Sequence, residues 1–83
     1  MTDPVDLRMF VRTALSTLPQ GRRMGETMLY THLRQDFAEL RVEELRAAIE
    51  WNHARGYIDF RRNHDLERDE WALTETGRAK EGL

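Results

Sequence analysis

The sequence predicts a small α+β domain in which three helices precede a two-stranded hairpin and a short final helix. As far as Gly56, apolar residues recur at three- and four-residue spacing, which is the pattern of helices with one buried face. From Tyr57 the period changes to two, which is typical of a half-buried strand. The 83 residues are enough for one modest core, so a single domain over residues 1–83 is expected.

The first helix is predicted from Asp3-Pro4 to about Leu18. Aspartate is a preferred N-cap residue, and proline at the first helical position lacks only an N–H that the helix leaves unpaired. One apolar stripe follows, and its members are Leu7, Phe10, Val11, Ala14, Leu15 and Leu18. Pro19 and Gly21 then end the helix.

Two further helices are predicted in the middle of the chain. In "ETMLYTHLRQDF", residues 26–37, an apolar residue repeats every four positions as far as Phe37, and Glu26 suits the positive end of the helix. The third helix is "RVEELRAAIEWNHARG", which ends at Gly56, the residue type that most easily adopts a left-handed stop. Its inward side is predicted to hold Val42, Leu45, Ala48, Ile49 and Asn52.

The last third of the chain predicts a hairpin and a capped helix. Ile58 and Phe60 alternate with polar residues, the stretch "NHDLERD" is typical of a turn, and Trp71 and Leu73 alternate on the return strand. Phe60 and Trp71 are therefore expected to face the core. Thr74 is expected to cap a short helix through "ETGRAKEGL", which its two glycines weaken.

Two stretches of this pattern resemble known bacterial regulators. The stretch "LRAAIEWNHARGYI" looks like the third-helix ending of winged-helix regulators, and "WALTETGRA" is similar to the Leu-Thr-x-x-Gly ending of the MarR- and PadR-type families. With the order of helices and hairpin, the resemblance covers nearly the whole chain. It implies a small winged helix-turn-helix fold in which the third helix enters a DNA major groove and the hairpin, or wing, contacts backbone.

Eight basic residues are the candidate DNA contacts. The face of the third helix opposite the core is the presumed reading face, and it is predicted to hold Glu43, Arg46, Ala47 and Glu50, with Ala54 beyond. Arg46 is the residue of this face expected to read a base edge. Arg41, near the start of that helix, either clamps a phosphate or packs its stem at the helix entrance. The other candidates lie on the loop before the second helix and on the wing: Arg22, Arg23, Arg61, Arg62, His64 and Arg68.

The acidic residues leave alternatives open. Carboxylates of the wing can neutralise its arginines by cross-strand pairing, and these are Asp59, Asp65, Glu67, Asp69 and Glu70. Glu43 and Glu50 share the presumed reading face with Arg46, where phosphates would repel them. Trp51 lies off the core stripe and either packs under the wing or meets a partner. An acidic face beside Trp51 suits a protein surface, so the rival hypothesis is a protein-interaction module, an inhibitor or adaptor without DNA binding.

Composition narrows the remaining function classes. The chain has no cysteine, and its three histidines lie on different predicted elements without metal-ligand spacing, so neither a metal nor another cofactor is expected. No phosphate-binding glycine loop or nucleophile motif is visible, and we do not expect an enzyme. No long apolar run is present, and we expect a cytoplasmic protein without a membrane partner.

The leading hypothesis is a bacterial or phage transcription regulator that binds double-stranded DNA. Among its 13 basic residues only Lys80 is a lysine, and arginine suits bidentate phosphate contacts. The formal net charge is nevertheless −2, which argues against a nonspecific polyanion binder but does not exclude a local basic patch. A homodimer would supply the affinity that so few cations cannot.

Overall fold

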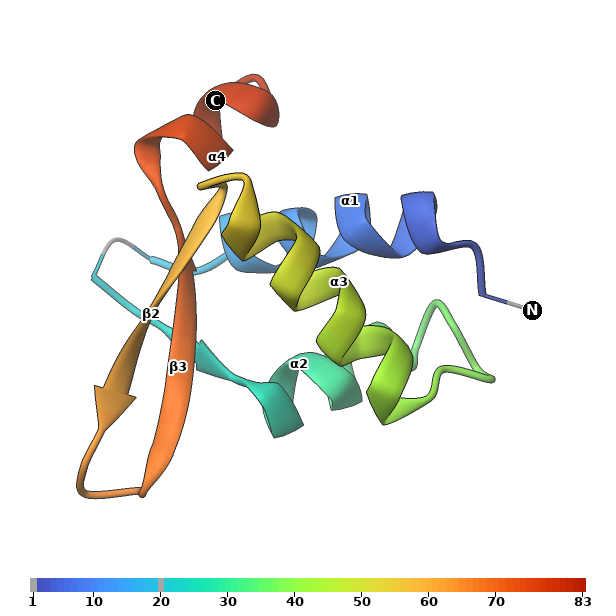
Figure 1. Ribbon diagram of the computed structural model, residues 1–83, viewed down its shortest axis with the longest axis horizontal. Coiled ribbons are helices and arrows are strands. Elements are labelled where there is room, and N and C mark those ends of the chain that lie inside the picture. Colours follow the sequence, from blue (N-terminus) through green and yellow to red (C-terminus); the bar gives the residue numbers. More distant parts are fainter. Residues whose placement is uncertain (1, 20) are drawn as a thin grey trace.

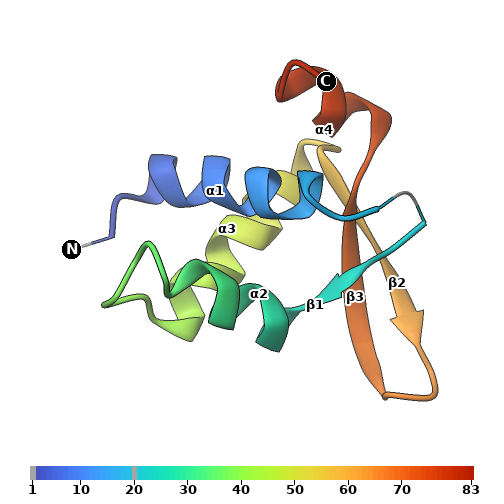
Figure 2. The same cartoon turned by 180° about the vertical axis from the view of Figure 1, so that it is seen from behind.

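The computed structural model describes residues 2–19 and 21–83, and in this part of the chain it has four helices and a three-stranded antiparallel sheet. The helices are α1 (Pro4–Ser16), α2 (Glu26–Leu33), α3 (Val42–Ala54) and α4 (Glu75–Lys80). The strands are β1 (Met24–Gly25), β2 (Ile58–Asn63) and β3 (Arg68–Leu73), in the sheet order β1-β3-β2. The predicted α+β class is confirmed. Figures 1 and 2 show α1, α2 and α3 to one side of the long β2–β3 hairpin.

Helix α1 begins as its sequence predicts. The Asp3 carboxylate accepts the N–H of Val5 at 2.8 Å, and Pro4 is the first helical residue. The apolar stripe faces the core, with Leu7, Val11, Ala14 and Leu15 buried. The helix ends at Ser16, close to the expected end at Leu18.

Helix α2 is shorter than its periodicity predicts. The expected extension to Phe37 is wrong, because regular helix ends at Leu33 and the next residues form turns. Gln35 and Asp36 donate their N–H groups three residues back, which tightens the last turn. The Phe37 ring packs edge-on against Phe10 of α1, with ring centroids 5.0 Å apart. Packing on α1 therefore decides where this segment turns.

Helix α3 carries most of its predicted core face. Leu45, Ala48, Ile49 and Asn52 are buried, whereas Val42, at the first helical position, is only partly buried. At the start, the Arg41 N–H donates to Glu44 Oε1 at 2.9 Å. After the helix, Gly56 has a φ of +75°, the left-handed conformation that the sequence predicts there.

The sheet has one strand more than the sequence predicts. Strand β1 pairs Met24 with Trp71 and Gly25 with Glu70 across β3, and two residues are too few to show a period of two. In the hairpin, Ile58 pairs with Leu73, and Ile58 is 1% exposed. Since side chains alternate along a strand, the helix-facing side of β2 carries Ile58, Phe60 and Arg62, and the outer side carries Asp59, Arg61 and Asn63.

The predicted burial of Phe60 in the core is wrong. Its side chain lies on the helix-facing side of β2, yet 48% of the residue is exposed. The hairpin extends beyond the helices that cover its first residues (Figure 1), so its outer part has no core to face. Trp71, opposite Phe60, is partly buried and packs against the core, in line with its predicted direction.

A buried polar network joins α1, α3 and the end of the chain. Arg12, which is 7% exposed, donates to Asn52 Oδ1 at 2.9 Å and to Glu81 Oε1 at 2.6 Å. Asn52 in turn donates to the carbonyl oxygens of Arg8 and Ala48. These bonds satisfy the buried groups and tie the residues after α4 to the helical layer.

Candidate nucleic-acid interface

The outward face of α3 is acidic rather than basic. Its exposed residues include Glu43, Arg46, Ala47, Glu50 and Ala54, so two carboxylates stand beside one arginine. The Arg46 Nε lies 2.8 Å from Glu26 Oε1 at the start of α2. The one arginine expected to read a base edge is therefore already compensated by a carboxylate.

The aliphatic part of the Arg41 side chain does not pack at the start of α3, so the predicted packing role of Arg41 is wrong. Its side chain is 76% exposed, and its Nε lies 3.8 Å from Glu43 Oε2. The residue precedes the helix as its N-cap and extends into solvent, because the buried positions at this end belong to apolar residues such as Leu40 and Leu45. The phosphate-contact prediction for Arg41 stays a prediction.

The wing arginines are mostly paired with carboxylates. Arg68 donates twice to Glu70 Oε2, at 2.8 and 3.0 Å, and Arg62 Nη1 lies 3.5 Å from Asp69 Oδ1 directly across the hairpin. The Arg62–Asp69 pair is the cross-strand pairing that the acidic residues of the wing suggest, whereas Arg68 and Glu70 lie on the same strand, β3. Neighbouring Arg61 and Arg62 point to opposite sides of β2, so they do not form one basic pair.

Three of the eight candidates are unpaired. Within residues 2–19 and 21–83, the side chains of Arg22, Arg61 and His64 make no hydrogen bond or ion pair. His64 lies in the exposed turn at the tip of the wing. Arg22 is exposed in the loop before β1, and Arg61 is exposed on the outer side of β2. These side chains keep their hydrogen-bond donors free for another molecule.

Four of the predicted arginines come together on the side of the sheet away from α3. We call this the outer sheet surface; it comprises Arg22, Arg23, Arg61 and Arg68 with Asp59 and Glu70. Arg22, Arg23 and Arg68 line one open hollow, Arg61 stands opposite Glu70, and Arg23 donates to Asp59 at 2.9 Å. Four arginines against two carboxylates leave a formal charge of +2.

The remaining predicted arginines have the opposite balance. Arg41, Arg46 and Arg62 lie on the helix side, and together with Glu26, Glu43, Glu50 and Asp69 this set of seven residues carries a formal charge of −1. The structure therefore divides the predicted site between two surfaces. The period of two in β2 is the sequence signal that could have separated Arg61 from Arg62.

Glu70 is held ionised on the outer sheet surface. Hydrogen bonds from Arg68 and then Asn63 lower the pKa of the Glu70 carboxyl below its ordinary 4.5, and the charge of Arg23 acts in the same direction. The ionised carboxylate keeps the Arg68 guanidinium in place. Arg68 is thus positioned on this surface even though its charge is compensated.

Sequence reasoning missed an aromatic cluster where α3 meets the wing. The His53 ring lies 5.5 Å from both Phe60 and Trp71, and these two lie 5.3 Å apart, measured between ring centroids. The spacing of His53 and Phe60 along the chain carries no signal for this contact. The cluster fixes the wing against the end of α3.

Neither the remaining structure nor the comparisons add a known site. In the part of the chain that the structure describes, no three His, Asp or Glu side chains gather as a possible metal site. None of the described helices has the length and apolar character to cross a bilayer. Comparisons with protein-family models, curated proteins and solved structures found no match to this chain.

Proposed function

We propose that the chain is a winged-helix domain that binds double-stranded DNA, in the role of a bacterial or phage transcription regulator. The order α1-β1-α2-α3-β2-β3, with a projecting hairpin and an exposed face on α3, supports the winged-helix assignment. A fold alone does not determine a function, so the DNA proposal depends on the distribution of charge.

The outer sheet surface is the observation that carries this proposal. It gathers four arginines, and two of them, Arg22 and Arg61, have no acidic partner among the described residues. A free guanidinium can form two parallel hydrogen bonds with a phosphate. Arg22 and Arg61 are thus the proposed phosphate contacts, and Arg23 and Arg68 add positive potential from fixed positions.

Helix α3 has a secondary role in this proposal. The Arg46–Glu26 pair is exposed, since 66% of the Arg46 side chain is accessible, and exposed pairs contribute only about 0 to 1 kcal/mol. A base edge can therefore replace Glu26 as the partner of Arg46. Glu43 and Glu50 on the same face repel phosphates, so a single domain binds weakly and a homodimer provides the working affinity.

The same acidic face favours a second candidate function, a protein-interaction module. Glu50 has no ion-pair partner among the described residues, and half-exposed Phe60 lies near the end of α3. Carboxylates beside an aromatic ring match a basic protein surface better than a DNA groove. DNA binding and its response to salt separate the two candidates.

The test is a titration of labelled random-sequence duplex DNA with the protein at about 50 mM and about 200 mM salt, in which fluorescence anisotropy reports binding. The double variant Arg22→Gln/Arg61→Gln should bind more weakly and reduce the slope of log affinity against log salt by about 1.8, or 0.9 per lost phosphate contact. The control Arg8→Gln/Arg55→Gln removes two unpaired cations from another surface and should keep the wild-type slope.

Circular dichroism and a thermal melt establish that both double variants are folded. Equal losses in the two variants would mean that only total charge matters and would remove the outer sheet surface from the mechanism. No binding by the folded wild-type protein at the lower salt would overturn the DNA proposal and favour the protein-interaction module.

A further inference from the structure

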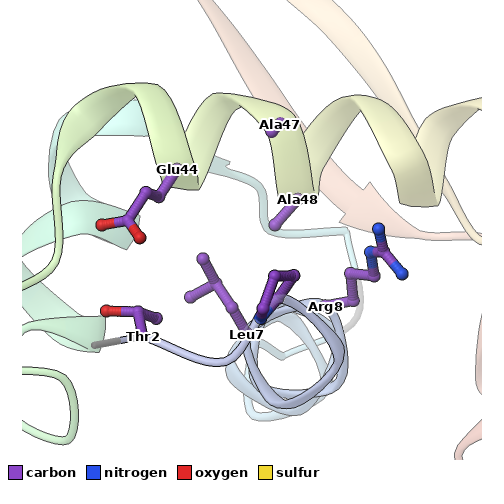
Figure 3. Close-up of a pocket in the computed structure, with 7 residues that line it drawn as sticks. Thr2, Leu7, Arg8, Glu44, Ala47 and Ala48 are labelled. Atoms are coloured by element: carbon purple, nitrogen blue, oxygen red, sulfur yellow. The ribbon is translucent and has the colours of Figure 1, made fainter.

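A groove between the start of α1 and α3 has a lining unlike the rest of the surface. Its floor is apolar, formed by Pro4, Leu7, Ala47 and Ala48, and its volume is about 150 Å³. A cavity of about this size can hold a benzene-sized group. Figure 3 shows Leu7 pointing from α1 toward Ala48 of α3 across this space.

One end of the groove is cationic, and it adjoins an aromatic residue, Trp51, that lies outside the groove lining. Arg8 lines this end, and the Arg8 Cζ lies 4.6 Å from the centroid of the Trp51 ring. Arg55 Cζ lies 3.8 Å from the same centroid. Contact with the indole restrains both guanidinium groups, so less conformational entropy is lost when they bind an anion.

These two arginines lack the acidic partners that other arginines of the chain have. The arginines with a carboxylate within ion-pair distance are Arg12, Arg23, Arg41, Arg46, Arg62 and Arg68. Within the described residues, Arg8 and Arg55 have no such carboxylate. Two free guanidinium groups beside an apolar floor form a surface that complements an acid next to an apolar side chain.

The other end of the groove is polar and acidic. Glu44 and Thr2 lie there, at the opposite end from Arg8 (Figure 3). One Glu44 oxygen accepts the N–H of Arg41 at 2.9 Å, which holds the carboxylate at the first turn of α3. A bound chain would therefore place its acidic groups toward Arg8 and a donor, such as a backbone N–H or a hydroxyl, toward Glu44.

We propose that this groove binds a short acidic peptide segment of a partner protein, with one apolar side chain in the pocket and an aspartate or glutamate on Arg8 and Arg55. The apolar floor favours a peptide over nucleic acid, because a phosphate backbone has no group that gains from burial against Pro4, Leu7 and Ala48. This proposal gives half-buried Trp51 a role as the support for the two arginines, and it does not rest on DNA binding.

The test uses short acetylated and amidated peptides in which leucine or phenylalanine precedes aspartate and glutamate. Binding is followed in two-dimensional NMR spectra of the ¹⁵N-labelled protein, where Trp51 and Trp71 give separate indole N–H signals that a Trp71→Phe variant assigns. Saturable shifts should appear at the Trp51 indole and the Ala47 and Ala48 amides. Peptides with serine for the apolar residue, or lysine for the acids, should bind at least about tenfold more weakly.

Matched variants separate this groove from the outer sheet surface. Arg8→Gln/Arg55→Gln should weaken peptide binding by at least about tenfold, whereas Arg22→Gln/Arg61→Gln should leave it unchanged. Ala47→Glu, at an exposed position, should also weaken it by bringing a like charge to the groove. All variants are checked for a folded spectrum first.

Three outcomes would overturn the proposal. They are the absence of saturable shifts with every acidic peptide, equal binding of the lysine peptides, and shifts of the Trp51 indole with single-stranded oligothymidine or inorganic phosphate but not with peptide. The last result would assign the two arginines to phosphate. None of these results depends on whether the outer sheet surface binds duplex DNA.

Discussion

Gly77→Ala tests a close contact on which the position of α4 depends. Gly77 is buried, and a Cβ atom built at this position would lie 1.9 Å from the carbonyl oxygen of Tyr57 and 2.9 Å from a methyl carbon of Leu73. The Tyr57 oxygen also accepts the N–H of Thr74 at 3.0 Å, so it is fixed by the residue that caps α4. The chain cannot accommodate a methyl group here unless α4 and the Tyr57 segment move apart.

The size of the effect follows from two opposing contributions. Alanine is a better helix former than glycine by about 1 kcal/mol, which would stabilise α4. Carbon and carbonyl oxygen approach to about 3.3 Å at closest, so α4 and the Tyr57 carbonyl must separate by about 1.4 Å. Overpacking typically costs about 1 to 3 kcal/mol, and a strained Thr74–Tyr57 bond adds about 1 kcal/mol. We expect a net loss of about 1 to 3 kcal/mol in the free energy of unfolding.

The assay is urea denaturation monitored by circular dichroism, with Ala79→Gly as the matched control. Ala79 is exposed on the same helix, and glycine there should cost about 1 kcal/mol through helix propensity alone. If propensity alone governed α4, the two substitutions would change stability in opposite directions. An unchanged or raised urea midpoint for Gly77→Ala would refute the steric argument.

Two further predictions concern the core and the wing. Leu45 is fully buried and Trp51 is half-buried, so Leu45→Ala should create a cavity and lower the free energy of unfolding by about 2 to 5 kcal/mol. Trp51→Ala should lower it by less. Equal or reversed losses in a denaturant melt would show that Trp51 belongs to the core. The pKa of Glu70 is lowered by folding, so its contribution to stability is present above the ordinary value of 4.5 and is lost as pH falls through the lowered pKa. Glu70→Gln should therefore flatten the acid side of the stability profile, measured as urea midpoint against pH, and an unchanged profile would contradict the pairing with Arg68.

Local signals were sufficient for most of the fold. Asp3 and Pro4 specify the start of α1 and Gly56 specifies the end of α3 through interactions within a few residues, and the change of period after Tyr57 predicts the hairpin. Strand β1 was missed because its two residues show no pattern without their partner β3. The end of α2 was misplaced because a contact with Phe10 in another helix turns the chain.

The candidate site was less predictable, because ion pairs form through space between residues far apart in sequence. Arg46 meets Glu26 across 20 positions, and Arg23 meets Asp59 across 36. The residue types alone therefore indicate which side chains carry charge, but not which charges remain free. The structure leaves Arg22 and Arg61 unpaired on the sheet among the described residues, and Arg8 and Arg55 without a carboxylate at Trp51.

By itself the sequence determined the approximate positions of the helices, the caps at Asp3 and Thr74, the stop at Gly56, the hairpin and the absence of cysteine chemistry, since these depend on composition and on short-range patterns. The tertiary structure decided the length of α2, the sides of the sheet on which the arginines lie and the groove between α1 and α3. Gly77 illustrates the difference, because its sequence context indicates only a weak helix. The folded chain brings the Tyr57 carbonyl against it, and packing between distant segments makes the glycine necessary.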